Sequence, residues 1–127
     1  MESSSYYKNQ IDKVSDEIHD LKKNVISCTS YIDSLSSLYE LLQSTYDGND
    51  RAYNAFLNGG YLNDGITLDN GILLHDNKIL ENDLRRIESL TKSISSKIYD
   101  MEEKISVLNT KLVQLNNNYK EALNAER

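Results

Sequence analysis

The sequence predicts an all-α protein, built as a long antiparallel two-helix coiled-coil hairpin with a Gly-rich connector. Three observations support this prediction: two series of mostly apolar residues spaced alternately by three and four, all five glycines between positions 48 and 71, and no proline. A repeat of 3.5 residues is typical of a helix that winds along another helix. We therefore predict a single domain over residues 1–127, with helices over about 4–46 and 77–125 and a connector over 47–76.

The first apolar series starts at Tyr7 and ends at Tyr46. Its steps alternate between four and three without a break, whereas a strand would repeat every two residues. Ser3, Ser4 or Ser5 is expected to cap this helix, because a serine side chain accepts a hydrogen bond from a free first-turn amide. The members of the series are Tyr7, Ile11, Val14, Ile18, Leu21, Val25, Cys28, Ile32, Leu35, Tyr39, Leu42 and Tyr46.

The second series shows the same alternation. Only Thr91 breaks its apolar character, and Leu90 beside it can supply the missing apolar surface. Asp76 or Asn77 is expected to cap the second helix. Two such series in one chain predict two helices that bury their apolar stripes against each other. The members are Leu80, Leu84, Ile87, Thr91, Ile94, Ile98, Met101, Ile105, Leu108, Leu112, Leu115, Tyr119 and Ala122.

The segment between the two series has a different composition. Residues 47–50 (Asp-Gly-Asn-Asp) are predicted to end the first helix, because glycine tolerates the left-handed conformation found there and Asn and Asp favour turns. Residues 51–57 are compatible with a short helix, and three further turn signals follow between 58 and 71. A tiny strand hairpin within 66–74 is an alternative for the end of this segment. A connector of roughly 30 residues is usually functional or mobile.

Composition argues against several classes of partner. The net charge is −6 and the basic residues are scattered among acidic ones, which disfavours binding to nucleic acid or to an anionic membrane surface. The sequence contains no apolar run of 18 residues, so membrane insertion is not expected. The N-terminus lacks the pattern of a secretory signal peptide. The single cysteine, Cys28, falls in the first apolar series and is expected to be a small buried hydrophobe.

The sequence offers no constellation of residues for an enzyme. His19 and His75 are far apart, and neither stands in a cluster with metal-ligand spacing. The acidic residues between 64 and 76 lack the twelve-residue calcium-loop spacing and its terminal Glu. No Gly-rich phosphate loop is present. We therefore predict no catalytic, cofactor-binding or metal-binding residues.

Several apolar residues lie outside the two series. A two-helix hairpin buries little surface, so these residues predict a face that a partner covers. Tyr99, Val107 and Val113 fall at heptad positions b and c, on the side of the second helix that faces away from the first. The predicted partner-binding residues are Tyr99, Val107, Val113, Leu90, Leu38 and Leu41.

Residues 93–102 (Ser-Ile-Ser-Ser-Lys-Ile-Tyr-Asp-Met-Glu) are similar to the Lys-Ile-aromatic-Asp-aliphatic-Glu run on the second helix of the YwqH-like small helical proteins. Tyr6-Tyr7 and the first heptads also fit this family. Its members are encoded beside LXG toxins of the type VII secretion system in Gram-positive bacteria, and resemble the small Trp-Xaa-Gly hairpins exported by that pathway. The Trp-Xaa-Gly turn is absent here, and the nearest match predicts a turn at Leu57 and Gly59.

The resemblance implies a targeting factor or chaperone without enzymatic activity. Such a protein would bind the helical N-terminal domain of an LXG toxin beside a second small helical protein, and the secretion ATPase would recognise the assembly. It would reside in the cytoplasm or be exported with the toxin complex. Export signals of this superfamily resemble an aromatic residue four positions before an acid. Tyr99 and Glu103 match this pattern on the second helix, and Tyr46 and Asp50 match it near the predicted tip.

A self-assembling coiled coil with a structural or tethering role is the alternative function. Ile and Val at position a with Leu at position d suit a parallel dimer. The Gly-rich connector favours the hairpin, because a continuous rod would not interrupt its heptads.

Overall fold

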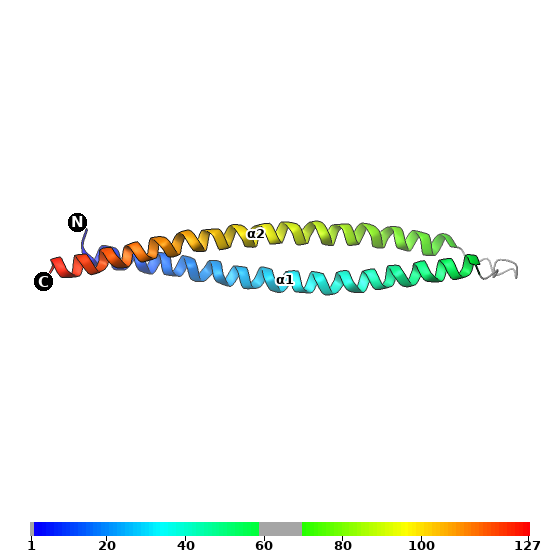
Figure 1. Ribbon diagram of the computed structural model, residues 1–127, viewed down its shortest axis with the longest axis horizontal. Helices are drawn as coiled ribbons and strands as arrows, with labels where there is room; N and C mark the ends of the chain where they lie inside the picture. Colours follow the sequence, from blue (N-terminus) through cyan, green and yellow to red (C-terminus); the bar gives the residue numbers. More distant parts are fainter. Residues whose placement is uncertain (1, 59–69) are drawn as a thin grey trace. The chain divides into compact units, whose positions relative to one another are not determined.

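The computed structural model describes residues 2–58 and 70–127, and these form two helices, α1 (Ser4–Asn58) and α2 (Asn70–Ala125) (Figure 1). The helices pack against each other and run in opposite directions: Ser4 lies beside Glu126, and Asn49 lies beside Asn77. The described residues contain no strand. The predicted all-α helical hairpin is therefore confirmed.

The chain divides into two compact units, each built from one part of α1 and one part of α2. The first unit comprises Met1–Ser30 and Ile94–Arg127, and the second comprises Tyr31–Ser93. In a two-helix hairpin a residue contacts only its own helix and the stretch of helix opposite, so packing is local within each unit.

The core of the first unit is formed by Val14 and Ile18 of α1 and Leu108 of α2. Half-buried aliphatic residues extend it on both sides, among them Leu21 and Ile105. Every member of the two predicted apolar series is buried or half-buried, which confirms the heptad assignment. Burying one such aliphatic side chain contributes about 1.5–3 kcal/mol, so this seam between the helices is the main source of stability.

Two contacts hold the N-terminal end of α1. The Ser3 hydroxyl accepts a hydrogen bond from the Tyr6 amide at 3.2 Å, so Ser3 caps the helix as the sequence predicted. Glu126, just beyond α2, accepts bonds from the Ser4 amide at 2.9 Å and the Ser4 hydroxyl at 2.7 Å. These bonds lower the pKa of the Glu126 carboxyl, the backbone bond contributing most. The two ends of the hairpin's chain are thereby joined.

Both helices extend into the segment that was predicted as a connector. α1 continues to Asn58 and α2 begins at Asn70, so the predicted boundaries near 46 and 77 are wrong. Asp76 and Asn77 therefore lie within α2 and do not cap it. The short helix predicted over 51–57 is part of α1, and the strand alternative is wrong for residues 70–74, which are helical.

The physical reason is that the alternation of three and four continues past the predicted ends. On α1 it reaches Asn49 and Tyr53, and on α2 it reaches back to Asn77 and Leu73. All four of these side chains are buried or half-buried. Contacts across the seam thus outweigh the turn propensity of the Asp-Gly-Asn-Asp run at 47–50. Of the predicted turn residues, Leu57 belongs to α1 and Gly59 lies outside the described residues.

Gly48 is an interior helical residue rather than a helix terminus, which gives a testable prediction. A methyl group at this position would meet no neighbouring atom within 4 Å. Gly48→Ala is therefore expected to raise the free energy of unfolding by about 0.5–1 kcal/mol, since glycine is a poorer helix former than alanine. Urea denaturation followed by circular dichroism measures this change.

The matched control is Ala52→Gly, at an exposed position one helical turn further on. It should lower the free energy of unfolding by a similar amount. A loss of stability in Gly48→Ala would instead indicate that α1 ends near residue 48, as the turn signals suggested.

Candidate interaction surface

The residues predicted to bind a partner are all exposed. Tyr99, Val107 and Val113 of α2 have exposed fractions of 63%, 66% and 62%, high values for large apolar side chains. They belong to the first unit. Leu38 and Leu41 of α1 and Leu90 of α2 are exposed in the second unit. The structure thus leaves each of these side chains accessible to another molecule.

The three residues of the first unit do not form one strip. Each residue turns an α-helix by about 100°, so Tyr99 and Val113, fourteen positions apart, share one face of α2. Val107 lies at position c, about 100° around the helix from that face. The predicted strip therefore consists of a Tyr99–Val113 face and a separate Val107 face.

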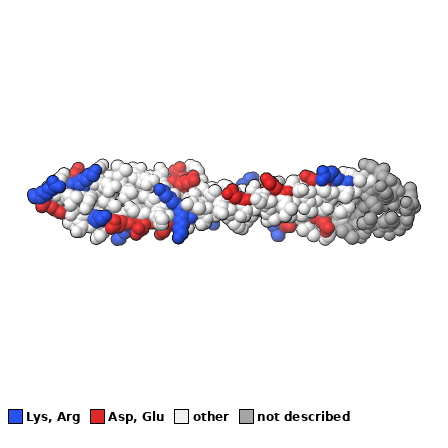
Figure 2. All heavy atoms as spheres, turned by 90° about the horizontal axis from the view of Figure 1, so that it is seen from below, with Lys and Arg blue, Asp and Glu red and all other residues white. Residues whose placement is uncertain are grey.

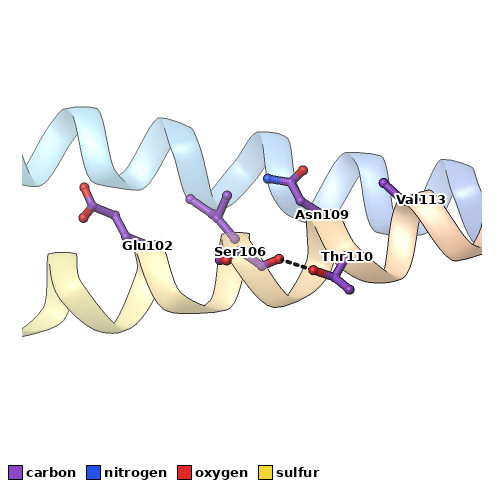
Figure 3. Close-up of a pocket in the computed structure, with 6 residues that line it drawn as sticks. Glu102, Ser106, Asn109, Thr110 and Val113 are labelled. Carbon is purple, nitrogen blue, oxygen red and sulfur yellow. Dashed lines mark hydrogen bonds between the residues drawn. The ribbon is translucent and has the colours of Figure 1, made fainter.

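Val113 lines a shallow groove on its own face of α2 (Figure 3). Ile105, a half-buried seam residue, also lines it, and small polar residues surround both. The Thr110 hydroxyl donates to the backbone carbonyl of Ser106 at 3.2 Å and so does not reach across the groove. The groove is lined by Glu102, Ile105, Ser106, Asn109, Thr110 and Val113.

In the second unit, Leu38 and Leu90 both occupy position g of their heptads. The g positions of two antiparallel helices flank the same side of the seam. The Tyr39 hydroxyl donates to Glu88 at 2.9 Å, which places these two leucines within about one turn of a single contact between the helices. Tyr31, also at g and also exposed, extends this apolar edge. Sequence reasoning missed Tyr31, although its spacing of seven from Leu38 marks the same edge.

A groove of the second unit lies between the helices, where Ile32 and Tyr39 of α1 approach Ile87 of α2. Ser36 is short enough to leave these seam residues accessible, and Thr91, the polar member of the second series, also lines the groove. Its remaining residues, Glu40, Glu88 and Lys92, carry charges of both signs. The groove therefore carries one more acidic than basic residue.

Two tyrosine–carboxylate bonds connect the helices in the second unit. Tyr39 donates to Glu88 and Tyr46 donates to Glu81, each at 2.9 Å. The hydrogen bond to the carboxylate is the largest cause of a raised pKa at each tyrosine. Burial comes next for Tyr39, and the negative charge of Glu81 comes next for Tyr46.

These bonds predict a loss of stability at alkaline pH. Because the folded pKa of each tyrosine lies above its ordinary value of 10.0, the contribution is present below pH 10.0 and disappears as the pH rises through the folded pKa. Between about pH 9 and 11 the wild type should lose stability more steeply than a Tyr39→Phe/Tyr46→Phe variant. Urea denaturation across this range measures the difference.

Tyr31→Phe serves as the control, because Tyr31 is exposed and its hydroxyl makes no hydrogen bond with the described residues. It should follow the wild-type profile. Identical profiles for the wild type and the double variant would contradict the prediction.

The seam contains a polar pair that sequence reasoning missed. The side-chain amide of Asn49 donates to the side-chain oxygen of Asn77 at 3.1 Å. The side-chain amide of Asn77 donates to the backbone carbonyl of Tyr46 at 3.4 Å. Asn77 is only 9% exposed. Continuing each apolar series by one step would have found both residues, but the turn signals around Gly48 obscured the continuation.

The two candidate export motifs differ in accessibility. Tyr99 and Glu103 are both exposed on α2 and lie four residues apart, so they share a face. Tyr46 and Asp50 also lie four residues apart on one helix, because α1 continues past the predicted tip. The Tyr46 side chain is half-buried with its hydroxyl bonded to Glu81, which leaves the Tyr99–Glu103 pair as the accessible motif.

Groups of three or more His, Cys, Asp or Glu side chains able to hold a metal ion are absent from the described residues. His19 and His75 are both exposed. Cys28 is a free thiol and half-buried, less enclosed than the predicted buried hydrophobe. Over the part of the chain that the structure describes, neither helix has a stretch apolar enough to cross a membrane.

Charged side chains of both signs are interspersed over the face seen in Figure 2, with uncharged areas between them. Comparison of the chain with protein-family models, curated proteins and solved structures found no match.

Proposed function

We propose that this chain is a targeting factor or chaperone without enzymatic activity, which binds the helical N-terminal domain of an LXG toxin for type VII secretion. The single observation that carries the proposal is the exposure of large apolar side chains on a hairpin with a thin core. Tyr99, Val107 and Val113 lie outside the seam and contact no second layer of the same unit. Covering Val107 and Val113 with a partner helix would stabilise the complex through apolar burial.

The choice of toxin and pathway comes from the resemblance of residues 93–102 to the YwqH-like proteins. A second small helical protein would complete the assembly, with one partner covering α2 of the first unit and another covering the Leu38–Leu90 edge of the second. Such a division fits the two separate sets of exposed apolar residues.

The alternative, a self-assembling parallel coiled coil, requires the α1 seam to face another chain. In the hairpin α2 occupies that seam, with Leu108 packed on Val14 and Ile18. This arrangement favours the partner-binding function. Light scattering of the isolated protein should report a monomer, and a stable dimer would favour the alternative.

Co-expression with the N-terminal domain of an LXG toxin encoded beside this chain tests the proposal by size-exclusion chromatography. The two proteins should elute together. The double variant Val107→Asp/Val113→Asp should bind the toxin domain at least about tenfold more weakly while helicity is retained. Each of the two substitutions places a charge in an apolar interface.

Asn116→Asp with Asn117→Asp is the matched control, since it adds the same charge at exposed positions of the same helix. This variant should still co-elute with the toxin domain. Separate elution of two well-folded wild-type proteins would refute the proposed function.

Tyr99 and Glu103 are the residues that we propose for recognition by the secretion ATPase. Their exposure and shared face support this role. Glu103→Ala should leave the complex with the toxin intact and abolish export of the toxin into the medium. Unchanged export would remove this pair from the proposal.

A further inference from the structure

Three lysines form a row along α2 of the first unit. Lys97, Lys104 and Lys111 are spaced by seven residues, all at heptad position g, and all three are exposed. None of them forms an ion pair with any of the described residues. Of the g positions of α1 in the first unit, Gln10 and Asn24 carry no charge and Glu17 is the one acid.

A groove between α1 and α2 lies beside this row. Its half-buried apolar residues are Leu21 and Cys28 of α1 and Met101 of α2. Lys97 and Lys104 form its rim on α2, whereas the α1 rim consists of the short, uncharged side chains of Asn24 and Ser27. Asp100 also lines the groove and is its one acidic residue. The surface thus combines an apolar floor with an uncharged α1 rim and an α2 rim that carries two lysines and one aspartate.

We propose that this groove binds an amphipathic helix of the partner whose acidic residues repeat every seven positions and face Lys97, Lys104 and Lys111. The inference specifies the chemistry of the helical partner and rests on the function proposed above. The apolar face of the bound helix covers Leu21, Cys28 and Met101, as a third helix added to a coiled coil does.

The one-sided charge also determines how the bound helix is rotated. Its acidic flank must face α2, because the α1 rim offers Asn24 and Ser27, which carry no charge. Charge complementarity of this kind contributes mainly to specificity and to the rate of association. The apolar floor and the net charge of −6 favour an acidic helix over a phosphate backbone, which requires dense positive charge.

The test uses two synthetic amphipathic helical peptides of roughly three heptads with leucine at a and d. One peptide carries glutamate along one flank, and the other carries lysine at the same positions. Fluorescence anisotropy with the full-length protein should show binding of the glutamate peptide that weakens as salt is added. The lysine peptide should bind at least about tenfold more weakly.

Charge reversal of the row provides the decisive comparison. Lys97→Glu, Lys104→Glu and Lys111→Glu together should reverse the preference, so that the lysine peptide binds better than the glutamate peptide. The matched control reverses three other exposed lysines of the same unit, Lys13, Lys23 and Lys120, and should retain the wild-type preference. Ser27→Arg, which places a long side chain in the groove, should weaken binding of both peptides.

Three results would overturn the inference. The first is equal binding of the two peptides, and the second is an unchanged preference after reversal of the lysine row. The third is that neither peptide binds, whereas the protein binds anionic phosphatidylglycerol vesicles and loses this binding when the lysine row is reversed. The inference and the proposed function fail in distinguishable ways. If the toxin domain co-elutes with both the wild type and the charge-reversed protein, only the groove assignment is wrong. If the glutamate peptide binds as expected but the toxin domain does not co-elute, only the choice of partner is wrong.

Discussion

Leu108→Ala is expected to lower the free energy of unfolding by about 2–5 kcal/mol. Leu108 is 9% exposed and packs with Val14 and Ile18 at the centre of the first unit. Removing its side chain leaves a cavity that the two helices can close only in part. The buried cluster contains few other residues that could compensate. The loss is therefore a large fraction of the stability of a chain of this size. Urea denaturation followed by circular dichroism measures it.

Its matched control lies one residue away. Val107 is 66% exposed, so Val107→Ala removes apolar atoms that face water and should change the free energy of unfolding by less than about 0.5 kcal/mol. Similar losses in the two variants would contradict the assignment of Leu108 to the seam. Because Val107→Ala should leave the protein folded, any loss of partner binding in this variant reports on the interface and not on unfolding.

Replacing Asn49 and Asn77 together with leucine is expected to raise the free energy of unfolding by about 1–3 kcal/mol while the protein loses its single oligomeric state. The two side chains bond to each other within the seam, and an apolar pair of similar volume would pack there without burying amides. A buried Asn pair is satisfied in only one alignment of the helices, so it disfavours shifted pairing and association with other chains. Denaturation and light scattering measure the two effects.

The control for this pair is Asn54→Leu with Asn82→Leu, which makes the same chemical change at exposed positions of the second unit. It should remain monomeric with nearly unchanged stability. A single monomeric species in the Asn49→Leu/Asn77→Leu variant would show that the pair does not specify the alignment. Asn77→Leu alone should be less stable than the double variant, because the Asn49 amide then loses its partner.

The fold was largely predictable from local pattern. The alternation of three and four in residues such as Val14, Ile18 and Leu108 reports burial directly, since only one stripe of each helix can face the other. The boundaries were harder to predict. Turn propensity at Gly48 and contacts across the seam at Asn49 are in conflict, and only the partner helix determines which prevails.

The exposed apolar residues of the candidate surface were predictable from the sequence, whereas the groove between the helices was not. Exposure of Tyr99, Val107 and Val113 follows from their heptad positions. Their division into two faces also follows from helical geometry, although the prediction treated them as one strip. The groove beside Lys97 and Lys104 was not predictable, because it depends on which α1 side chains stand opposite α2.

The sequence by itself determined that this protein is a pair of long helices with a seam of repeating apolar residues, because a period of 3.5 places those residues on one stripe whatever surrounds them. Only the tertiary structure decided where the helices end, that Asn49 meets Asn77, and that tyrosine hydroxyls reach carboxylates on the facing helix. These features depend on how residues far apart in the chain are aligned. That alignment follows from the summed contacts of two helices, which the pattern within either helix does not contain.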